Sequence, residues 1–432
     1  MADDDNPTTQ PMTPVDAPPA GLRVVIGAGI IGLAVALRLR QKGHDVLVVD
    51  RSGVAAGASR GNAGALAFSD ILPLASPGIL AQAPGWLLDP LGPLSLRPGY
   101  LPQITPWLWR FWRASQPGRV AASTAAQAAL MRLSAQALPG LLELAGAQHL
   151  LRSGGNLHLY TSPTAWQASL PGWQVRAAHG IAFEHLRSGQ AIAELQPGLH
   201  PRLEAATFVP GWQTITDPLV LTLTLAATFE RLRGQIRRAG VRALQPGADG
   251  VQVLLEGGEC VLATRVVLAA GAWSRPLARS LGDRIPLETE RGYNTTLPAG
   301  AFDLRRQLTF ASQGFVATPI AGGVRVGGAV ELGGLRAAPN FKRADAMLAL
   351  ARRFMPGLKT EGGAQWMGFR PSMPDSLPVI GPAPGDGRVI YAFGHGHLGL
   401  TQAAATAQLV LDLHEGMTPA IDLQPFSPRR FG

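Results

Sequence analysis

Hydrophobic positions near the start of the chain predict a strand, a helix and a second strand in close succession. The run Arg23–Ile26 is apolar after its first residue and ends at a glycine-rich turn, and Ile30–Gln41 is rich in Ala and Leu, as helices are. Gly43 suits the position after a helix C terminus, and Asp45–Asp50 is a second apolar run. The stretch Gly21–Asp50 therefore predicts a β-α-β unit, close to the roughly 30 residues that such a unit needs.

Further along the chain, long helical stretches alternate with short strands. Helices are expected over 119–149 with a break at Pro139, over Pro218–Ala239, over 341–355 and over Leu400–His414. Strands are expected at Val251–Leu255, Thr264–Ala270 and Val389–Phe393. Residues 286–335 have an antiparallel pattern, in which a turn at Gly322 and Gly323 joins the strands of a hairpin, Phe315–Ile320 and Val324–Glu331.

This order of elements predicts an α/β fold made of two parts. The first is a Rossmann-like nucleotide-binding domain assembled from separate stretches, and the second is an inserted α+β domain rich in antiparallel strands. We assign 1–20 to a disordered tail, 21–100, 196–285 and 364–432 to the nucleotide-binding domain, and 101–195 and 286–363 to the inserted substrate-binding domain. The tail is polar and has neither the basic start nor the apolar segment of a signal peptide.

Composition and charge exclude several classes of protein. Apolar residues make up 46% and charged residues 16% of the 432 residues, which is a globular composition. Lys and Arg exceed Asp and Glu by 38 to 29, but no basic run alternates with aromatic residues, so we expect no nucleic-acid binding. The basic excess is either a solvated surface or an attraction for an anionic membrane face or an acidic substrate. Cys260 is the only cysteine, which excludes an internal disulfide and a Cys-based metal site, and we expect no metal.

The turn after the first strand carries a dinucleotide fingerprint. Its residues follow the pattern GxGxxG, as Gly27-Ala28-Gly29-Ile30-Ile31-Gly32. Gly27 permits the tight turn, Gly29 lets a pyrophosphate approach the backbone, and Gly32 lets helix and strand pack closely. Asp50, at the end of the next strand, suits the adenosine ribose hydroxyls and disfavours the 2′-phosphate of NADP. The motif alone does not choose between FAD and NAD, and a glycine-rich turn without a ligand remains the alternative.

Five motifs in this order give the chain a resemblance to a known family. They are the fingerprint, Ala58–Gly64, Val266–Ser274, Glu290–Tyr293 and a C-terminal set made of Trp366–Pro371, Pro374–Pro378 and Gly394–Thr401. From Arg23 to Phe431, the chain resembles the DAO superfamily of FAD-dependent D-amino-acid dehydrogenases and glycine/sarcosine oxidases. The likeness is greatest to the bacterial D-amino-acid dehydrogenase branch, which includes D-hydroxyproline dehydrogenases.

The resemblance implies FAD as the cofactor and assigns its contacts. The expected cofactor-binding residues are Gly27, Gly29, Ile30, Ile31, Gly32, Asp50, Arg51, Ser59, Asn62, Ala63, Gly64, Leu66, Ala270, Gly271, Trp273, Gly396, His397, Leu398, Gly399, Leu400 and Thr401. The Gly394–Thr401 loop opens the last helix, and the resemblance places it at the flavin pyrimidine edge, where a helix N terminus stabilises negative charge. Covalent-flavin members of the family use a C-terminal cysteine that this chain lacks, so non-covalent FAD is expected.

The same resemblance implies four catalytic residues. Arg370, in a run similar to the G-F-R-P of D-amino-acid oxidases, is expected to bind the substrate carboxylate, for which a planar guanidinium is suited; the alternative is a structural salt bridge. Tyr293 is expected near the substrate, or else packed within the sheet. His395 and His397 are expected to donate to the flavin or contact substrate, or else to be loop histidines held by backbone bonds.

The implied reaction is FAD-dependent dehydrogenation of a small D-amino acid, with hydride transfer from the α-carbon to flavin N5 and hydrolysis of the imine. D-proline or hydroxy-D-proline is the expected substrate, on resemblance alone. None of the three lysines falls in a flavin motif, where some oxidases of the superfamily place one to activate oxygen, so electrons are expected to pass to a quinone or another carrier. An oxygen-using glycine/sarcosine-type amine oxidase, a pyridine-nucleotide dehydrogenase and a non-catalytic flavoprotein remain alternatives.

A cytoplasmic location is expected, with peripheral contact at the inner face of the membrane as a hypothesis. The uncharged stretch Ile71–Leu88 contains three prolines, which would break a transmembrane helix. This stretch and the cluster of Trp107, Trp109 and Trp112 either touch a membrane, cover the active site or pack in the core.

Overall fold

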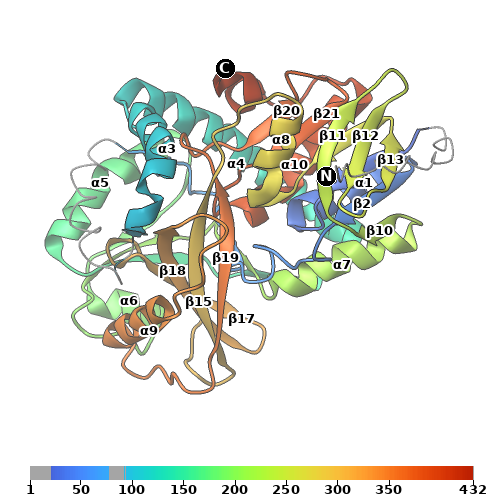
Figure 1. The fold of residues 1–432 in the computed structure, drawn as a ribbon. Helices are drawn as coiled ribbons and strands as arrows, with labels where there is room; N and C mark the ends of the chain where they lie inside the picture. The colour runs from blue at the N-terminus through green and yellow to red at the C-terminus, as the bar shows by residue number, and fades with distance from the viewer. Residues whose placement is uncertain (1–20, 77–91, 93, 432) are drawn as a thin grey trace, which may run out of the picture.

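The computed structural model describes residues 21–76, 92 and 94–431. The expected tail (1–20) and most of the uncharged stretch Ile71–Leu88 lie outside the described residues. Figure 1 shows two regions built around different sheets, with the chain passing between them several times. Within the described part of the chain, no helix is long and apolar enough to cross a membrane.

The first region is built on a six-stranded sheet in the order β10-β2-β1-β14-β21-β20. In that order the strands are Gln235–Arg238, Val46–Asp50, Arg23–Ile26, Arg265–Leu268, Val389–Phe393 and Val379–Pro382. Neighbouring strands are parallel except β20 and β21, which are antiparallel. The central strands are apolar throughout, as strands covered on both faces are, and the β-α-β unit predicted from the sequence is confirmed.

Both faces of this sheet are covered, because side chains alternate along each strand. Val25 and Val48 pack against the helices α1, α4, α7 and α10, which comprise Ile30–Gln41, Pro117–Ala145, Pro218–Arg231 and Gly399–Glu415. Val24 and Val49 pack on the other side, against α8 and a small antiparallel sheet, which comprise Ser274–Ser280 and the strands β11 Val241–Pro246, β12 Val251–Leu255 and β13 Cys260–Ala263. The result is a three-layer nucleotide-binding arrangement.

The second region is built on a nine-stranded, mostly antiparallel sheet. Its main path runs β19-β15-β18-β17-β16-β6-β8-β7, and β4 pairs with β18. In that order the strands are Ala364–Ser372, Glu288–Pro298, Gly323–Leu332, Phe315–Ile320, Gln307–Phe310, Asn156–Tyr160, Ala205–Val209, Glu184–Leu186 and, for β4, Leu94–Leu96. The hairpin predicted from the sequence is formed by β17 and β18, and the predicted fold class is confirmed.

The remaining elements are short or peripheral. Three short strands, β3 Ala65–Leu66, β9 Gln213–Ile215 and β5 Leu151–Ser153, pair in a third small sheet. The other helices are α3 Leu101–Ala114, α5 Pro163–Ala178, α6 Gly189–Leu195 and α9 Lys342–Phe354. Helix α9 packs on β15 and β18, as Figure 1 shows, and α6 contacts β8.

Two helix predictions are wrong in detail. The helix expected over Pro218–Ala239 ends at Arg231, because Arg233 adopts a φ of 64° and the chain reverses into β10. A side chain at Gly234 would collide with the ring of Phe229, so glycine is required at this reversal. The break expected at Pro139 does not occur: α4 continues through it, because apolar residues on both sides of the proline pack into one core.

The expected domain boundaries also differ from the sheets. β8 and β19 fall in ranges assigned to the nucleotide-binding domain, but both belong to the nine-stranded sheet. Helix α4 falls in a range assigned to the inserted domain, but it packs with α1 and α10 over the six-stranded sheet. Hydrophobic pattern identifies a strand or helix, but only long-range pairing decides which sheet it joins.

Candidate active site

The turn between β1 and α1 is shaped by glycines that no other residue could replace without a collision. Gly27 has a φ of 114°, and a Cβ there would strike the backbone of Ala269 on the neighbouring strand. A Cβ on Gly32 would strike the carbonyl of Gly27. These contacts hold the first turn of α1 against the strand ends, where its N–H groups lack intrahelical acceptors.

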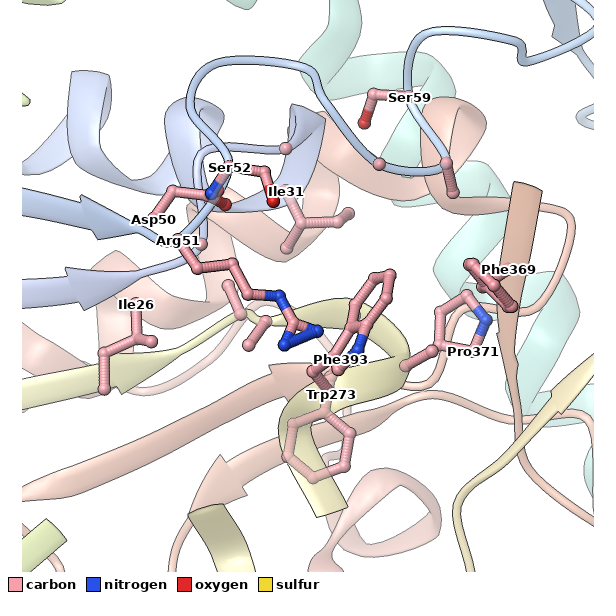
Figure 2. Close-up of a pocket in the computed structure, with 18 of the residues that line it drawn as sticks. Ile26, Ile31, Asp50, Arg51, Ser52, Ser59, Trp273, Phe369, Pro371 and Phe393 are labelled. Atoms are coloured by element: carbon pink, nitrogen blue, oxygen red, sulfur yellow. The ribbon is translucent and has the colours of Figure 1, made fainter. Parts of the chain in front are cut away.

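A cavity of about 410 Å³ opens at the carboxyl ends of β1, β2, β14 and β21. This is where open parallel sheets bind their ligands, and the volume lies within the range of about 300–1,000 Å³ typical of ligand sites. Figure 2 shows Asp50, Arg51 and Ser52 at one side of the cavity and Phe369 and Pro371, from β19, at the other. The cavity therefore extends from the six-stranded sheet to the edge of the nine-stranded one.

Asp50 and Arg51 form the end of the cavity next to β2. The Asp50 carboxylate accepts backbone N–H groups from Ala28 at 2.9 Å, Ser52 at 2.8 Å and Gly53 at 2.9 Å, which fixes its orientation. Two carboxylate oxygens offer about four acceptor positions, so a ribose hydroxyl can still bind here. Arg51 stacks over Trp273, with its guanidinium carbon 4.3 Å from the ring centroid.

The loop containing Ser59 and Asn62 connects the cavity to the second sheet. Ser59 Oγ accepts the N–H of Ile30 at 2.9 Å, at the start of α1. Asn294 of β15 donates to the carbonyl of Gly61 at 2.9 Å. A Cβ on Gly61 would lie inside the ring of Trp366, so the loop backbone is pressed against the edge strand β19. The glycine in this motif is therefore explained by packing between the two regions.

The loop before α10 forms the wall at the opposite end. His395 is buried and its Nε2 lies 2.9 Å from Thr406 Oγ1; burial lowers its pKa to about 3, so the ring is neutral. The N–H of Gly396 donates to the carbonyl of Pro371 at 2.7 Å, which fixes the loop to β19. His397 points away from this cavity and its Nε2 lies 3.1 Å from the carboxylate of Asp70.

A second, smaller cavity adjoins the first and shares His395 and Gly396 with it. It lies between α3, α4, the start of β15, the end of β19 and the loop before α10. Its lining residues are Leu72, Leu74, Phe111, Gln127, Glu290, Ser372, Met373, Ser376, Gly394, His395, Gly396, His397 and Leu398. One loop therefore separates a cavity with nucleotide-binding features from one lined by both apolar and polar side chains.

Arg370 lines neither cavity, but it lies opposite a residue that lines the second one. In the register of β15 and β19 it is opposite Glu290, and its Nη1 donates to the carbonyl of Ala329 at 3.1 Å. A Cβ on Gly292 would be 2.5 Å from the guanidinium carbon, so the glycine gives the side chain its space. Burial lowers the pKa of Arg370, and the charge of Glu290 opposes that shift.

Tyr293 is not brought together with Arg370. Its hydroxyl donates to Glu331 at 2.5 Å and accepts the N–H of Asn340 at 3.0 Å, within a buried network that lines neither cavity. Burial raises the pKa of this hydroxyl. The packed alternative weighed for this residue fits its position, because successive strand residues point to opposite faces of the sheet.

Most of the expected cofactor residues line the larger cavity. Those that do are Gly27, Gly29, Ile30, Ile31, Asp50, Arg51, Ser59, Asn62, Ala270, Gly271, Trp273, Gly396, Gly399 and Leu400. Gly32, Ala63, Gly64, Leu66 and Thr401 do not line it, and His397 and Leu398 line the smaller cavity instead. Thr401 bonds the backbone of β3, donating to Ala65 at 3.2 Å and accepting from Ala67 at 3.1 Å, which ties α10 to the Gly64–Leu66 segment.

Several lining residues were not singled out from the sequence. Phe369 lies inside the motif Trp366–Pro371, and Ser52 and Phe393 directly follow or precede predicted site segments, so proximity to those segments was a usable signal. Glu290 belongs to the motif Glu290–Tyr293, but its position opposite Arg370 depends on the register of β15 and β19. Gln127 lies on α4, far from every motif, and no sequence signal marked it.

The larger cavity fits FAD on its own geometry. Gly57, Gly271 and Gly396 line it, and no atom lies closer than 3.9 Å to a Cβ built on any of them. None of the residues that the structure describes fills the space in front of these bare backbone segments, so a flat ring or a pyrophosphate can lie against them. The first turn of α1 suits the phosphates, and Asp50 suits the ribose.

Comparisons with known proteins agree with this geometry. Residues 24–413 match the family described as DAO, FAD dependent oxidoreductase. The chain is 36% identical over 422 residues to a D-amino-acid oxidase of Bradyrhizobium diazoefficiens, covering 96% of this chain and 100% of that protein. It is 31% identical over 416 residues to a D-amino acid dehydrogenase of Rhizobium johnstonii, covering 95% and 99%.

Solved structures share the fold at lower identity. Glycine oxidase from Geobacillus kaustophilus has a TM-score of 0.76 at 22% identity, covering 94% of this chain and 98% of that one. L-proline dehydrogenase from P. horikoshii has a TM-score of 0.73 at 18% identity, covering 96% and 98%. The sequence matches span nearly the whole chain, and the protein therefore belongs to the DAO family of FAD-dependent oxidoreductases, with FAD as its cofactor.

Proposed function

We propose that this enzyme dehydrogenates a small D-amino acid. The observation that carries the proposal is Arg370, which is half-buried on β19 and lies opposite Glu290 of the smaller cavity, which in turn adjoins the nucleotide cavity across His395 and Gly396. A guanidinium held there is suited to the carboxylate of an amino acid. The names of the two relatives, D-amino-acid oxidase and D-amino acid dehydrogenase, support the substrate class.

Within this proposal each group has a separate task. Arg370 binds the carboxylate and sets the direction of the α-carbon. When bound, FAD supplies the acceptor for the hydride removed from that carbon. Gly399 and Leu400 bring the first turn of α10 to the cavity, where its N–H groups stabilise negative charge. His397, fixed by Asp70, presents its ring to the smaller cavity, while Leu72, Phe111 and Met373 exclude water.

The finer parts of the proposal concern the substrate and the acceptor. The substrate we propose is a small cyclic amino acid such as D-proline or hydroxy-D-proline; the second cavity, of about 20 Å³, has room for its amino group but not for the whole molecule. Electrons pass to a quinone or another carrier, since none of the lysines lines either cavity. FAD binds non-covalently, because Cys260 lies in β13, away from both cavities.

Helix α3 supports contact of a cytoplasmic enzyme with the inner face of a membrane. Trp107 is buried and stacks on Phe111, with ring centroids 5.2 Å apart, whereas Trp109 and Trp112 are 51% and 46% exposed. Arg113 lies over the Trp109 ring at 4.8 Å and supplies positive charge. Exposed tryptophans beside arginine suit an anionic lipid interface. Sedimentation with anionic vesicles at low salt tests this: the wild-type chain binds, the double variant Trp109→Ser, Trp112→Ser does not, and failure of the wild type contradicts the idea.

The test of the reaction is the visible spectrum of the purified, FAD-loaded protein under anaerobic conditions. A panel of D-amino acids that includes D-proline and hydroxy-D-proline is added, with the L-enantiomers as controls. Bleaching of the flavin bands by a D-amino acid supports the proposal and ranks the substrates. Flavin bands that no amino acid bleaches would contradict it.

A second candidate is an oxygen-using amine oxidase. The 36% identical relative named D-amino-acid oxidase favours it. The same preparation, exposed to air with the best substrate, distinguishes the two. Stoichiometric peroxide at a rate matching that with an artificial quinone identifies an oxidase, and slow peroxide formation with fast quinone reduction identifies a dehydrogenase.

A further inference from the structure

Glu290 is a buried carboxylate at the edge of the second cavity. It lies near the start of β15, is 6% exposed and lines that cavity. Antiparallel register places it opposite Arg370 of β19, so both side chains project from the same face of the sheet. An acidic and a basic side chain, Glu290 and Arg370, therefore lie on adjacent strands at the edge of the cavity.

Glu290 differs from the other buried acids in the described part of the chain. Glu288 accepts from the Tyr100 hydroxyl at 2.9 Å, and Glu331 accepts from Tyr293, Arg97 and Arg291. Asp412 accepts from Gln408 at 2.7 Å. None of the described residues donates a hydrogen bond to Glu290. Its interaction with Arg370 is electrostatic. A buried charge left without donors is costly, so a donor from outside the protein would be stabilised here.

Two neighbouring acceptors are unsatisfied in the same way. Gln127 Oε1 and Ser372 Oγ are buried, find no partner among the described residues, and belong to side chains that line the same cavity. They come from α4 and β19, so with Glu290 of β15 three different elements contribute oxygen-bearing side chains to the lining of one cavity. A protonated primary amine offers three N–H donors and a protonated secondary amine offers two, and either matches such a set better than the single donor of a hydroxyl group.

We propose that Glu290, assisted by Gln127 and Ser372, binds the ammonium group of the substrate while Arg370 binds its carboxylate. This inference rests on the proposed function and sharpens it. In an α-amino acid the two charged groups are attached to one carbon, so an acid and a base on adjacent strands can hold both. The pair selects zwitterionic amino acids with a primary or secondary amine, and it disfavours 2-hydroxy acids, which bring a negative charge and no positive one.

The experiment compares three matched probes on FAD-loaded wild type and Glu290→Gln. D-proline carries both charged groups, cyclopentanecarboxylate lacks the nitrogen, and pyrrolidine lacks the carboxylate. Each is titrated anaerobically while shifts or bleaching of the flavin bands are followed. Loss of a hydrogen bond to a charged group predicts about 10- to 100-fold weaker binding of D-proline and pyrrolidine in the variant. Cyclopentanecarboxylate is expected to bind as well or better, because a negative charge near Arg370 has been removed.

The alternative is that Glu290 only positions Arg370. In that case cyclopentanecarboxylate would weaken by the same factor as D-proline, and the proposal would be overturned. The proposal would also be overturned if pyrrolidine bound the variant as tightly as it binds the wild type, or if it bound neither protein. If Glu290→Gln folds poorly, Ser372→Ala and Gln127→Met supply the same readout, because both variants keep the Glu290 charge. For each variant we expect about threefold to tenfold weaker binding of D-proline and pyrrolidine, and unchanged binding of cyclopentanecarboxylate.

Failure of the reaction and failure of the anchor give different results. If no amino acid bleaches the wild-type flavin but pyrrolidine binds and the variant loses it, the dehydrogenase proposal falls and the cation site stands. If D-proline bleaches both proteins with the same concentration dependence, the dehydrogenase proposal stands and the anchor falls.

Discussion

Strand β15 carries a buried charged residue on each of its faces, Arg291 on one and Glu290 on the other, and only Arg291 has hydrogen-bond partners among the described residues. On one face, Arg291 is fully buried and donates to Glu331 and to the carbonyls of Gly334, Ala337 and Ala338. The pKa of Glu331 lies below its ordinary value, although burial alone would raise it, because Tyr293 and two arginines donate to it. This network is complete within the protein and needs no ligand.

On the other face, Arg370 has one carbonyl partner and Glu290 has no hydrogen bond among the described residues. Gln127 and Ser372, nearby, are unsatisfied as well. The acids of the two faces, Glu290 and Glu331, are almost equally buried, at 6% and 3% exposed, so burial of an acid does not distinguish structural charge from functional charge. The distinction lies in whether donors and acceptors are matched, and four substitutions test it.

The largest expected effect follows from changing Arg370. Arg370→Lys keeps the charge but loses the planar fork, so the carboxylate is held by one bond in place of two. We expect kcat/KM for the best D-amino acid to fall roughly 1,000-fold, about 4 kcal/mol, with flavin content and melting temperature unchanged. Steady-state kinetics with an artificial acceptor measure it. An equal fall for an amine that lacks a carboxylate would show that the loss is not in carboxylate binding.

The matched control on the satisfied face is Arg291→Met. It removes a fully buried guanidinium and leaves Glu331 short of a donor, which lowers the free energy of unfolding by about 3 kcal/mol. The folded fraction is expected to retain wild-type kcat/KM per bound flavin. Denaturant titration and active-site normalised kinetics check both parts. If Arg291→Met were as stable as the wild type and bound substrate more weakly, Arg291 would have a role in substrate binding, and the proposed difference between the two faces of β15 would be wrong.

The contrast also shows what the sequence could and could not predict. The first β-α-β unit was predicted almost to the residue, because glycine geometry, apolar runs and the acid at the strand end are local signals. Arg370 was identified by resemblance. Tyr293 and Glu290 were quoted in the same motif, yet the structure places the second beside Arg370 and the first in the satisfied network. Cross-strand register and a bulge between Arg291 and Tyr293 decide this, and neither can be read from one strand.

A smaller effect is expected from Gly292→Ala. The added Cβ would be 2.5 Å from the Arg370 guanidinium carbon, so the side chain must move, which a flexible side chain does at little cost in stability. We expect KM for the D-amino acid to rise about tenfold, with kcat and melting temperature nearly unchanged, since the carboxylate contact is misaligned but not removed. An unchanged KM would mean that the position of the guanidinium is not limiting. A variant that fails to fold would place Gly292 with the structural glycines of the first turn.

The smallest effect is expected from changing His395. This residue lies near Glu290, in the lining of the same cavity, but it has a hydrogen-bond partner, since Thr406 Oγ1 lies 2.9 Å from its Nε2. Burial lowers its pKa to about 3, below the roughly 6.5 of an unfolded histidine. Between these values the unfolded chain binds more protons than the native one, so stability rises with pH and is lost as pH falls from about 6.5 towards 3.

His395→Gln keeps a polar side chain and removes this titration. We expect the slope of unfolding free energy against pH to decrease by about 1 kcal/mol per pH unit between pH 4 and 6, while KM at pH 8 stays within about twofold of wild type. Burial lowers the pKa of His158 to about 3 as well, and His158 lines neither cavity, so His158→Gln is the control for the titration and should show the same change in slope. A large rise in KM for His395→Gln alone would move His395 into the group that binds substrate, and would show that a satisfied hydrogen bond on this loop can still be functional.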